Sequence, residues 1–156
     1  MKKNCARRLG LFLIAWTWGA ALLAQDYGGY VKYSGSSTPG VITVVSNGFG
    51  KNSRESSANA LAGALYTLLF KGLPGSACEL PMVPHEEEKK NDPAVVALLN
   101  GGYNAFVMED ITQSQVKTNK KQDGVTGIST THLITINCTS LRRYLEEKSV
   151  IRKFGN

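Results

Sequence analysis

Two glycines and a lysine follow a β-branched run in the stretch VVSNGFGKNSRESSANA, residues 44–60. Glycine-rich loops that open a helix can hold phosphate, because they present free backbone amides. The Walker template, however, requires a glycine five residues before the Gly50–Lys51 pair, and Val45 stands there. The dinucleotide fingerprint fails as well, because its third glycine is missing. The stretch therefore predicts a tight strand-to-helix turn, which Gly48 and Gly50 allow through their conformational freedom.

An alternative hypothesis keeps a binding role for the same turn. The first amides of the following helix would still be available to an anion. A small phosphate or carboxylate could bind there without any cofactor. The residues that would form this ligand site are Gly48, Gly50, Lys51 and Ser53.

The two histidines do not stand at spacings typical of a catalytic or metal site. His85 opens HEEEKK, where adjacent residues point in different directions and no HExxH spacing exists, so a solvated charge run is expected. His132 falls in a predicted strand, as a hydrogen-bonded or exposed residue. The G-x-S-x-G elbow of a serine nucleophile is missing, and a hydrolase would need a closed pocket that places Ser76 or two carboxylates beside a histidine. We expect no catalytic residues, no metal site and no cofactor.

The elements that must position these residues follow from residue patterns. VITVV at 41–45 is typical of a buried strand. Apolar residues then recur at helical spacing over 58–69, behind Asn52 or Ser53 as N-cap, and Gly72 followed by a proline ends that helix.

Beyond this helix the chain alternates loops, short elements and polar runs. It predicts a proline-rich and charged loop at 73–92, a short helix at 93–100, a strand at 103–109, a polar loop or hairpin at 110–124, a strand at 125–138 and a helix at 141–151 after Thr139 or Ser140. This order predicts an α+β fold, with a small mixed or antiparallel sheet and with the long helix and the C-terminal helix packed on one face.

The first 24 residues have the layout of a secretory signal peptide. A basic start leads into an apolar run of 16 residues, shorter than the roughly 20 that span a bilayer. We expect cleavage after Ala24 and no transmembrane segment afterwards, with an uncleaved anchor as the alternative. The predicted organisation is a signal peptide at 1–24, an irregular lead-in at 25–40 and a single α+β domain at 41–156 that contains the loop at 73–92.

Most of the positive charge belongs to this signal. The chain has 18 basic and 12 acidic residues, a net charge of +6, and four of the basic residues lie before Ala24. The remainder has 14 basic against 12 acidic residues, so we expect no nucleic-acid partner. The basic tail LRRYLEEKSVIRKFGN could face an acidic partner, or form a solvated helix.

Two cysteines, Cys78 and Cys138, remain after the predicted cleavage. Export exposes a chain to an oxidising compartment, where the two could form a disulfide. Two buried free thiols are the alternative, and the sequence does not choose between them.

The run ITVVSNGFGKNSRESSANALAGALYTLLFKGLPGS resembles the N-terminal domain of the flagellar assembly protein FlgT and related small outer-membrane lipoproteins. The shared pattern is a strand with a G-x-G-type turn, a capped alanine-rich helix and a glycine after it, over residues 41–72 and the strand at 125–138. The whole chain also looks like exported proteins of the Bacteroidetes type. The resemblance implies a bacterial α/β module of envelope assembly without catalytic residues. The chain departs from it by lacking a lipobox cysteine and by its insert at 73–92.

These patterns predict an exported, non-catalytic protein, periplasmic or outer-membrane-associated, that acts through contacts with an envelope protein partner. Aromatic and arginine side chains are the usual energetic anchors of interfaces. Tyrosines occur in the lead-in and arginines in the basic tail, and the proline loop is a third expected interaction surface. The expected interaction residues are Tyr27, Tyr30, Tyr33, Arg142, Arg143, Arg152 and Lys153.

Overall fold

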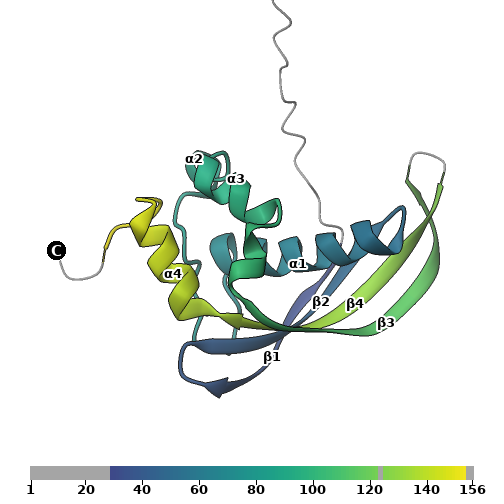
Figure 1. Ribbon diagram of the computed structural model, residues 1–156, viewed down its shortest axis with the longest axis horizontal. Helices are drawn as coiled ribbons and strands as arrows, with labels where there is room; N and C mark the ends of the chain where they lie inside the picture. The colour runs from purple at the N-terminus through teal and green to yellow at the C-terminus, as the bar shows by residue number, and fades with distance from the viewer. Residues whose placement is uncertain (1–28, 123–124, 154–156) are drawn as a thin grey trace, which may run out of the picture.

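The computed structural model describes residues 29–122 and 125–153, and their strands form an antiparallel sheet in the spatial order β1-β2-β4-β3. Helices lie on one side of this sheet, and no described helix covers the other side (Figure 1). The predicted α+β class, with the long helix and the C-terminal helix on one face, is confirmed. The strands are β1 (Val31–Thr38), β2 (Val41–Gly50), β3 (Val107–Gln122) and β4 (Val125–Asn137), and the helices are α1 (Ser53–Phe70), α2 (Glu86–Lys89), α3 (Pro93–Leu99), the 3₁₀ helix η1 (Gly102–Ala105) and α4 (Cys138–Glu147).

The centre of the sheet is the long pairing of β2 with β4, from Val41 opposite Asn137 to Gly50 opposite Ile128. Alternate residues of both strands point toward α1, as the two-residue period of a strand requires. At one end the side chains of this face are apolar and fully buried. At the other end they are polar, and Ser46 lies opposite His132 there. The apolar end consists of Ile42, Val44, Ile134 and Ile136, packed in one core with Leu65, Leu68 and Leu69 of α1.

Helix α1 begins and ends where the sequence predicts. The Asn52 side chain accepts the Glu55 amide hydrogen at 2.9 Å, and the Glu55 carboxylate accepts the Lys51 amide hydrogen at 3.1 Å. Each contact satisfies a donor that the first turn would leave unpaired. At the other end Gly72 has a φ of +74°, and its amide donates to the Thr67 carbonyl at 2.8 Å. That left-handed conformation favours glycine and stops the helix.

The lead-in expected to be irregular contains a strand. Residues 31–38 form β1, which pairs with β2 through a register that shifts twice. This pairing puts Val31 and Tyr33 against the core. Pairing with β2 and packing against the core are tertiary contacts, and they override a glycine- and serine-rich composition.

Two further segments differ from the prediction. The polar segment 110–124, expected as a loop or hairpin, supplies most of β3, while the strand expected from residue 103 begins at Val107 after the 3₁₀ helix η1. An edge strand half in water needs no apolar alternation, so its pattern was not visible. The loop at 73–92 holds a single helical turn, α2, and α4 is capped by Asn137 instead of Thr139 or Ser140.

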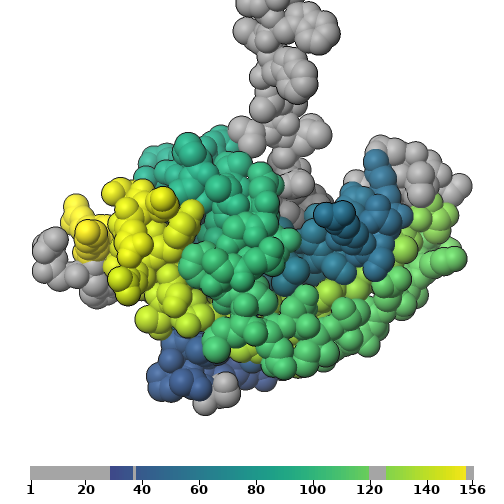
Figure 2. All heavy atoms as spheres, viewed as in Figure 1, coloured from purple at the N-terminus to yellow at the C-terminus, as the bar shows by residue number. Residues whose placement is uncertain are grey.

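Helix α4 and the described residues after it pack beside α2 and α3, on the same side of the sheet (Figure 2). Leu141 and Leu145 of α4 are fully buried, as predicted, and Tyr144 packs against Phe106 with ring centroids 5.3 Å apart. No helix in residues 29–122 and 125–153 is long and apolar enough to cross a membrane. The expected signal peptide at 1–24 and Tyr27 lie outside the described residues.

Candidate functional site

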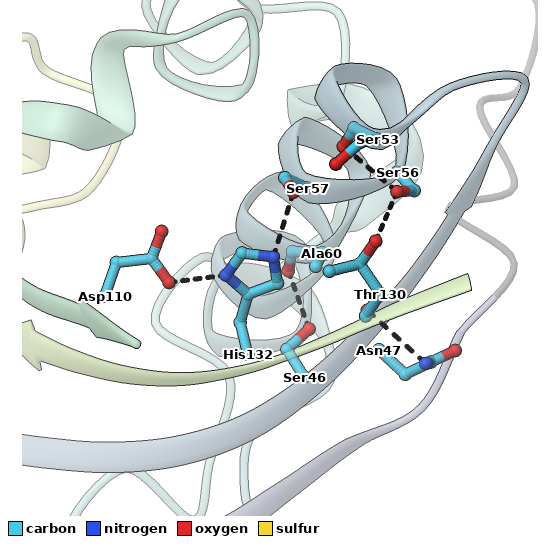
Figure 3. Close-up of polar contacts among 9 residues, drawn as sticks. All are labelled: Ser46, Asn47, Ser53, Ser56, Ser57, Ala60, Asp110, Thr130 and His132. Carbon is cyan, nitrogen blue, oxygen red and sulfur yellow. Dashed lines mark hydrogen bonds and ion pairs between the residues drawn. The ribbon is translucent and has the colours of Figure 1, made fainter. Parts of the chain in front are cut away.

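A chain of hydrogen bonds joins three elements beneath the first turns of α1 (Figure 3). Its centre is His132 of β4, whose side chain is only 2% exposed. Its Nδ1 lies 2.6 Å from Oδ1 of Asp110 on β3, and its Nε2 lies 3.0 Å from Oγ of Ser57 on α1. The contact with Asp110 fixes the plane of the imidazole, and the contact with Ser57 connects the sheet to the helix.

Further polar contacts surround this chain on the helical side of the sheet. Ser46 Oγ donates to the Ala60 carbonyl at 2.6 Å, and Ser56 Oγ lies 2.5 Å from Thr130 Oγ1 (Figure 3). In the part of the chain that the structure describes, every fully buried side-chain nitrogen or oxygen has a partner. A fully satisfied buried network is rigid and specifies one arrangement of its elements.

The order Ser57–His132–Asp110 matches the nucleophile, base and orienting acid of serine hydrolases. Catalysis by such a triad also needs free donors aimed at the developing oxyanion. Ser57 lies in the second turn of α1, where backbone amides bond to carbonyls four residues earlier, as Ser56 N does to Asn52 O at 3.0 Å. The geometry therefore supports a structural connection between helix and sheet more directly than it supports acyl transfer.

The sequence did not predict this cluster, because Ser57 and His132 are 75 residues apart. A hydrogen-bonded strand histidine was one of the two expectations for His132, and that one is confirmed. The available signal was alternation, since His132 shares the inward face of β4 with Ile134 and Ile136. The partner that the sequence considered, Ser76, instead donates to the Leu73 carbonyl at 2.7 Å within a local turn.

The two glycines of the predicted turn lie in β2, and their role differs from the expected one. Neither has a positive φ. A Cβ on Gly48 would lie 2.3 Å from the Ala60 nitrogen, and one on Gly50 would lie 2.5 Å from the Ser56 nitrogen. These glycines therefore let α1 lie directly on the strand, and the reversal itself occurs at Lys51 and Asn52.

The helix start that could have bound an anion is occupied by groups of the chain itself. Glu55 and Asn52 accept the local amide hydrogens described above, and Ser53 Oγ donates to Gln115 Oε1 of β3 at 2.7 Å. Lys51 is exposed at this position. The proposed ligand residues are thus adjacent in space, but a carboxylate already stands next to them.

The expected interaction residues fall into different environments. Tyr30 is exposed, with Lys32 Nζ 5.2 Å from its ring centre, whereas Tyr33 packs against the core. On α4, Arg143 Nε donates to Glu147 at 2.9 Å. The other three basic residues, Arg142, Arg152 and Lys153, line a common cavity.

This cavity has a volume of about 440 Å³ and lies between the loop that leads into α2 and the C-terminal segment. His85 is part of its wall and has a φ of 61°. The residues that line it are Met82, Pro84, His85, Lys89, Arg142, Val150, Ile151, Arg152 and Lys153.

The two described cysteines are both free, and their thiols lie next to each other, with Cys138 buried and Cys78 half-buried. A hydrogen bond from Cys138, helped by the charge of Arg142, lowers the pKa of Cys78 to about 7 against the opposing effect of burial. The same contact and burial raise the pKa of Cys138. Cys78 is therefore the more reactive thiol at neutral pH.

No group of three or more His, Cys, Asp or Glu side chains that could hold a metal ion occurs within the described ranges. Two of the three carboxylates of HEEEKK contact other partners. Glu86 accepts from Lys71 Nζ at 2.7 Å and from the Tyr66 hydroxyl, and Glu87 pairs with Lys90 at 2.6 Å. The hydrogen bonds from Lys71 and Tyr66 lower the pKa of Glu86.

Comparisons with protein-family models, curated proteins and solved structures give no match for this chain. The resemblance to the FlgT N-terminal domain thus stays a prediction from the sequence.

Proposed function

We propose that the protein is an exported, non-catalytic module that acts by binding a second protein at the bacterial cell envelope. The signal-peptide pattern supports export, and the free edge of β3 supports protein binding. β3 is the last strand of the sheet order and pairs with β4 alone in the described part of the chain. Such an edge presents unpaired N–H and C=O groups to which an extended segment of another protein can add as a strand.

Exposed apolar side chains accompany this edge. Met108, Ile111 and Val116 of β3 are 63%, 45% and 60% exposed. Ile111 lies opposite Leu133 and Val116 opposite Ser129, so both belong to the sheet face that no described helix covers. Exposed apolar groups beside an unpaired edge are typical of an interaction site.

Neighbouring strands add apolar side chains to this face, among polar ones. Leu133 lies opposite Val45 of β2, and Ser129 lies opposite Phe49. All of these side chains are half-buried or exposed on the uncovered face. An incoming strand with apolar residues at alternate positions would extend this surface and bury Ile111 and Val116.

The charges on β3 favour one half of the strand. Lys117 stands in its second half, and lysine on an edge strand opposes pairing with another chain. The segment from Ile111 to Val116 contains no charged residue. We therefore place the partner strand along this uncharged segment, next to the apolar face.

The binding surface is tested by charge substitution. The double variant Ile111→Lys, Val116→Lys should lose partner recovery in crosslinking from the native cells, because two ammonium groups would have to be desolvated in the interface. Leu80→Lys is the matched control, since Leu80 is 79% exposed on the loop after α1. Equal recovery of partners by the double variant and the wild type would contradict the assignment of the β3 edge.

The non-catalytic part of the proposal is tested at Ser57. A fluorophosphonate probe reacts with activated serine nucleophiles, and we expect no labelling of the folded protein. Labelling that disappears in Ser57→Ala but persists in Ser56→Ala would overturn this part, because the two serines are neighbours and only Ser57 contacts His132.

A further inference from the structure

The cavity beside the C-terminal segment combines an apolar wall with a cationic rim. Met82, Pro84, Val150 and Ile151 supply apolar surface, and Val150 is itself 4% exposed. The volume of about 440 Å³ lies within the range of roughly 300–1,000 Å³ that small-molecule sites occupy. The cavity is on the helical side of the sheet, so it is independent of the β3 edge and of the function proposed for it.

Backbone hydrogen bonds hold both walls of this cavity in place. The Met82 amide donates to the Leu68 carbonyl at 3.2 Å and the Val83 amide to the Leu69 carbonyl at 2.8 Å, which attaches the loop to the end of α1. Across the cavity, the Val150 amide donates to the Leu145 carbonyl of α4 at 2.9 Å. The site is therefore preformed, and a ligand need not organise it.

Positive charge predominates around the opening. Lys89, Arg142, Arg152 and Lys153 line the cavity, and no carboxylate is among its described lining residues. Arg142 Nε donates to Glu146 at 3.2 Å, which orients the guanidinium on α4. Grouped cations attract an anion and raise its local concentration.

The carboxylates nearest in sequence to the loop wall are engaged elsewhere. Glu86 contacts Lys71 and Tyr66, and Glu87 contacts Lys90. Because its pKa is lowered by these donors, Glu86 stays ionised and bound to them as the pH falls toward its ordinary value. Glu86 and Glu87 thus do not neutralise the cations of the cavity.

Backbone strain is concentrated at the same place. His85 and Ser149 are the non-glycine residues with positive φ in the described chain, at 61° and 59°. His85 lines the cavity, and Ser149 directly precedes Val150 in its opposite wall. Left-handed conformations cost energy for residues with a Cβ and tend to occur at functional sites.

From these observations we infer that the cavity binds a small molecule with one anionic head, a carboxylate or a phosphate, and a short apolar tail. The tail lies against Val150 and Ile151, and the head lies between Arg152, Lys153 and Lys89. Both parts contribute to binding, because burial of the tail removes apolar surface from water and the head gains charge-assisted hydrogen bonds.

Calorimetric titration of the protein with four probes tests both parts of this ligand. Octanoate and octyl phosphate carry the tail and a head, octanol carries the tail alone, and inorganic phosphate carries the head alone. We expect both octyl anions to bind, and octanol and phosphate to bind at least about ten-fold more weakly, since one charge-assisted contact is worth that factor. The tighter of the two octyl anions identifies the head group.

A charge-matched pair of variants locates the site. Arg152→Gln, Lys153→Gln removes two cations from the rim, whereas Arg143→Gln, Lys148→Gln removes two exposed cations that do not line the cavity. All four side chains are exposed, so both variants should fold, which unchanged thermal melting verifies. The first variant should weaken octyl-anion binding by about ten-fold or more and the second by less than about two-fold.

Two results would overturn the inference. One is the absence of binding of either octyl anion at millimolar concentration to the folded wild-type protein. The other is an equal loss of affinity in the two variants, which would indicate attraction by net charge rather than a site in this cavity.

Discussion

The buried histidine depends on polar partners from two other elements of the fold. His132 is almost fully enclosed, yet both of its ring nitrogens have partners, one from β3 and one from α1. A buried polar group costs little when it is paired and much when a partner is removed. His132 should therefore be important for stability whether or not any reaction occurs beside it.

Replacing this residue tests its structural role. His132→Ala should lower the free energy of unfolding by about 2–4 kcal/mol, through a new cavity and the lost partner of Ser57. Asp110→Asn, which preserves shape and one hydrogen bond to the ring, should cost less than about 1 kcal/mol because Asp110 is partly exposed. Urea unfolding measures both, and an unchanged midpoint for His132→Ala would show that the cluster does not stabilise the fold.

The sequence predicted the roles of single residues but not the contact between Ser57 and His132. Capping by Asn52, one of the two caps considered, and the inward direction of Leu141 and Leu145 depend on local pattern, and both are confirmed. The contact of Ser57 with His132 depends on the β2–β4 register and on how closely α1 approaches the sheet. No spacing in the sequence encodes that distance.

At the scale of elements, the close contact of β2 with α1 determines where everything else lies. Ser46, Gly48 and Gly50 present small side chains or none to the helix, so its first turns approach the strand directly. The second half of α1 carries leucines and rests on the larger Ile42 and Val44. The change in side-chain size along β2 thus sets how the helix lies on the sheet.

Adding one carbon to β2 tests this geometry. Gly48→Ala should lower the free energy of unfolding by about 1–3 kcal/mol, because its Cβ would collide with the backbone of α1. Gly35→Ala in β1 is the matched control, since a Cβ there meets nothing within 4 Å and should change stability by less than about 0.5 kcal/mol. Equal denaturation midpoints for the two variants would contradict close packing at Gly48.

Elements with a strong local signal were predicted well, and elements defined by their neighbours were not. Helix α1 has caps, periodicity and a terminating glycine, and all of these were readable. Strand β1 was predicted as irregular and most of β3 as a polar loop or hairpin, because both are edge strands with polar or small residues. Their conformation comes from pairing with β2 and β4.

At the scale of the whole molecule, Cys78 and Cys138 connect distant parts of the chain. Cys78 belongs to the loop after α1, and Cys138 begins α4, at 60 positions further along the sequence. The contact between the two thiols places them where oxidation could join them. The disulfide that the sequence left open is therefore compatible with this fold.

Oxidised glutathione should convert the pair to a disulfide. The Cys78 thiolate attacks the glutathione disulfide and releases one glutathione; the Cys138 thiol then loses its proton and displaces the second glutathione. The rate should rise with pH through about 7, where Cys78 ionises. Mass spectrometry should detect the loss of two hydrogens.

The closed loop should raise the free energy of unfolding by roughly 4 kcal/mol in the chain-entropy model. Cys138→Ser should stop at a glutathione adduct on Cys78, with its reaction midpoint moved to higher pH, because the hydrogen bond that lowers the pKa of Cys78 is altered. Failure of the wild-type protein to form the internal disulfide under conditions that produce this adduct would contradict the adjacency of the thiols.

The order of strands along the chain has a consequence for synthesis and for the proposed export. β4 is the last strand to be made, yet it occupies an interior position between β2 and β3. Until it emerges, β2 has no neighbour on that side, and Ile42 and Val44 cannot complete their core. Nearly the whole polypeptide must therefore be synthesised before it can reach its final form, which would keep the chain unfolded for the export that we propose.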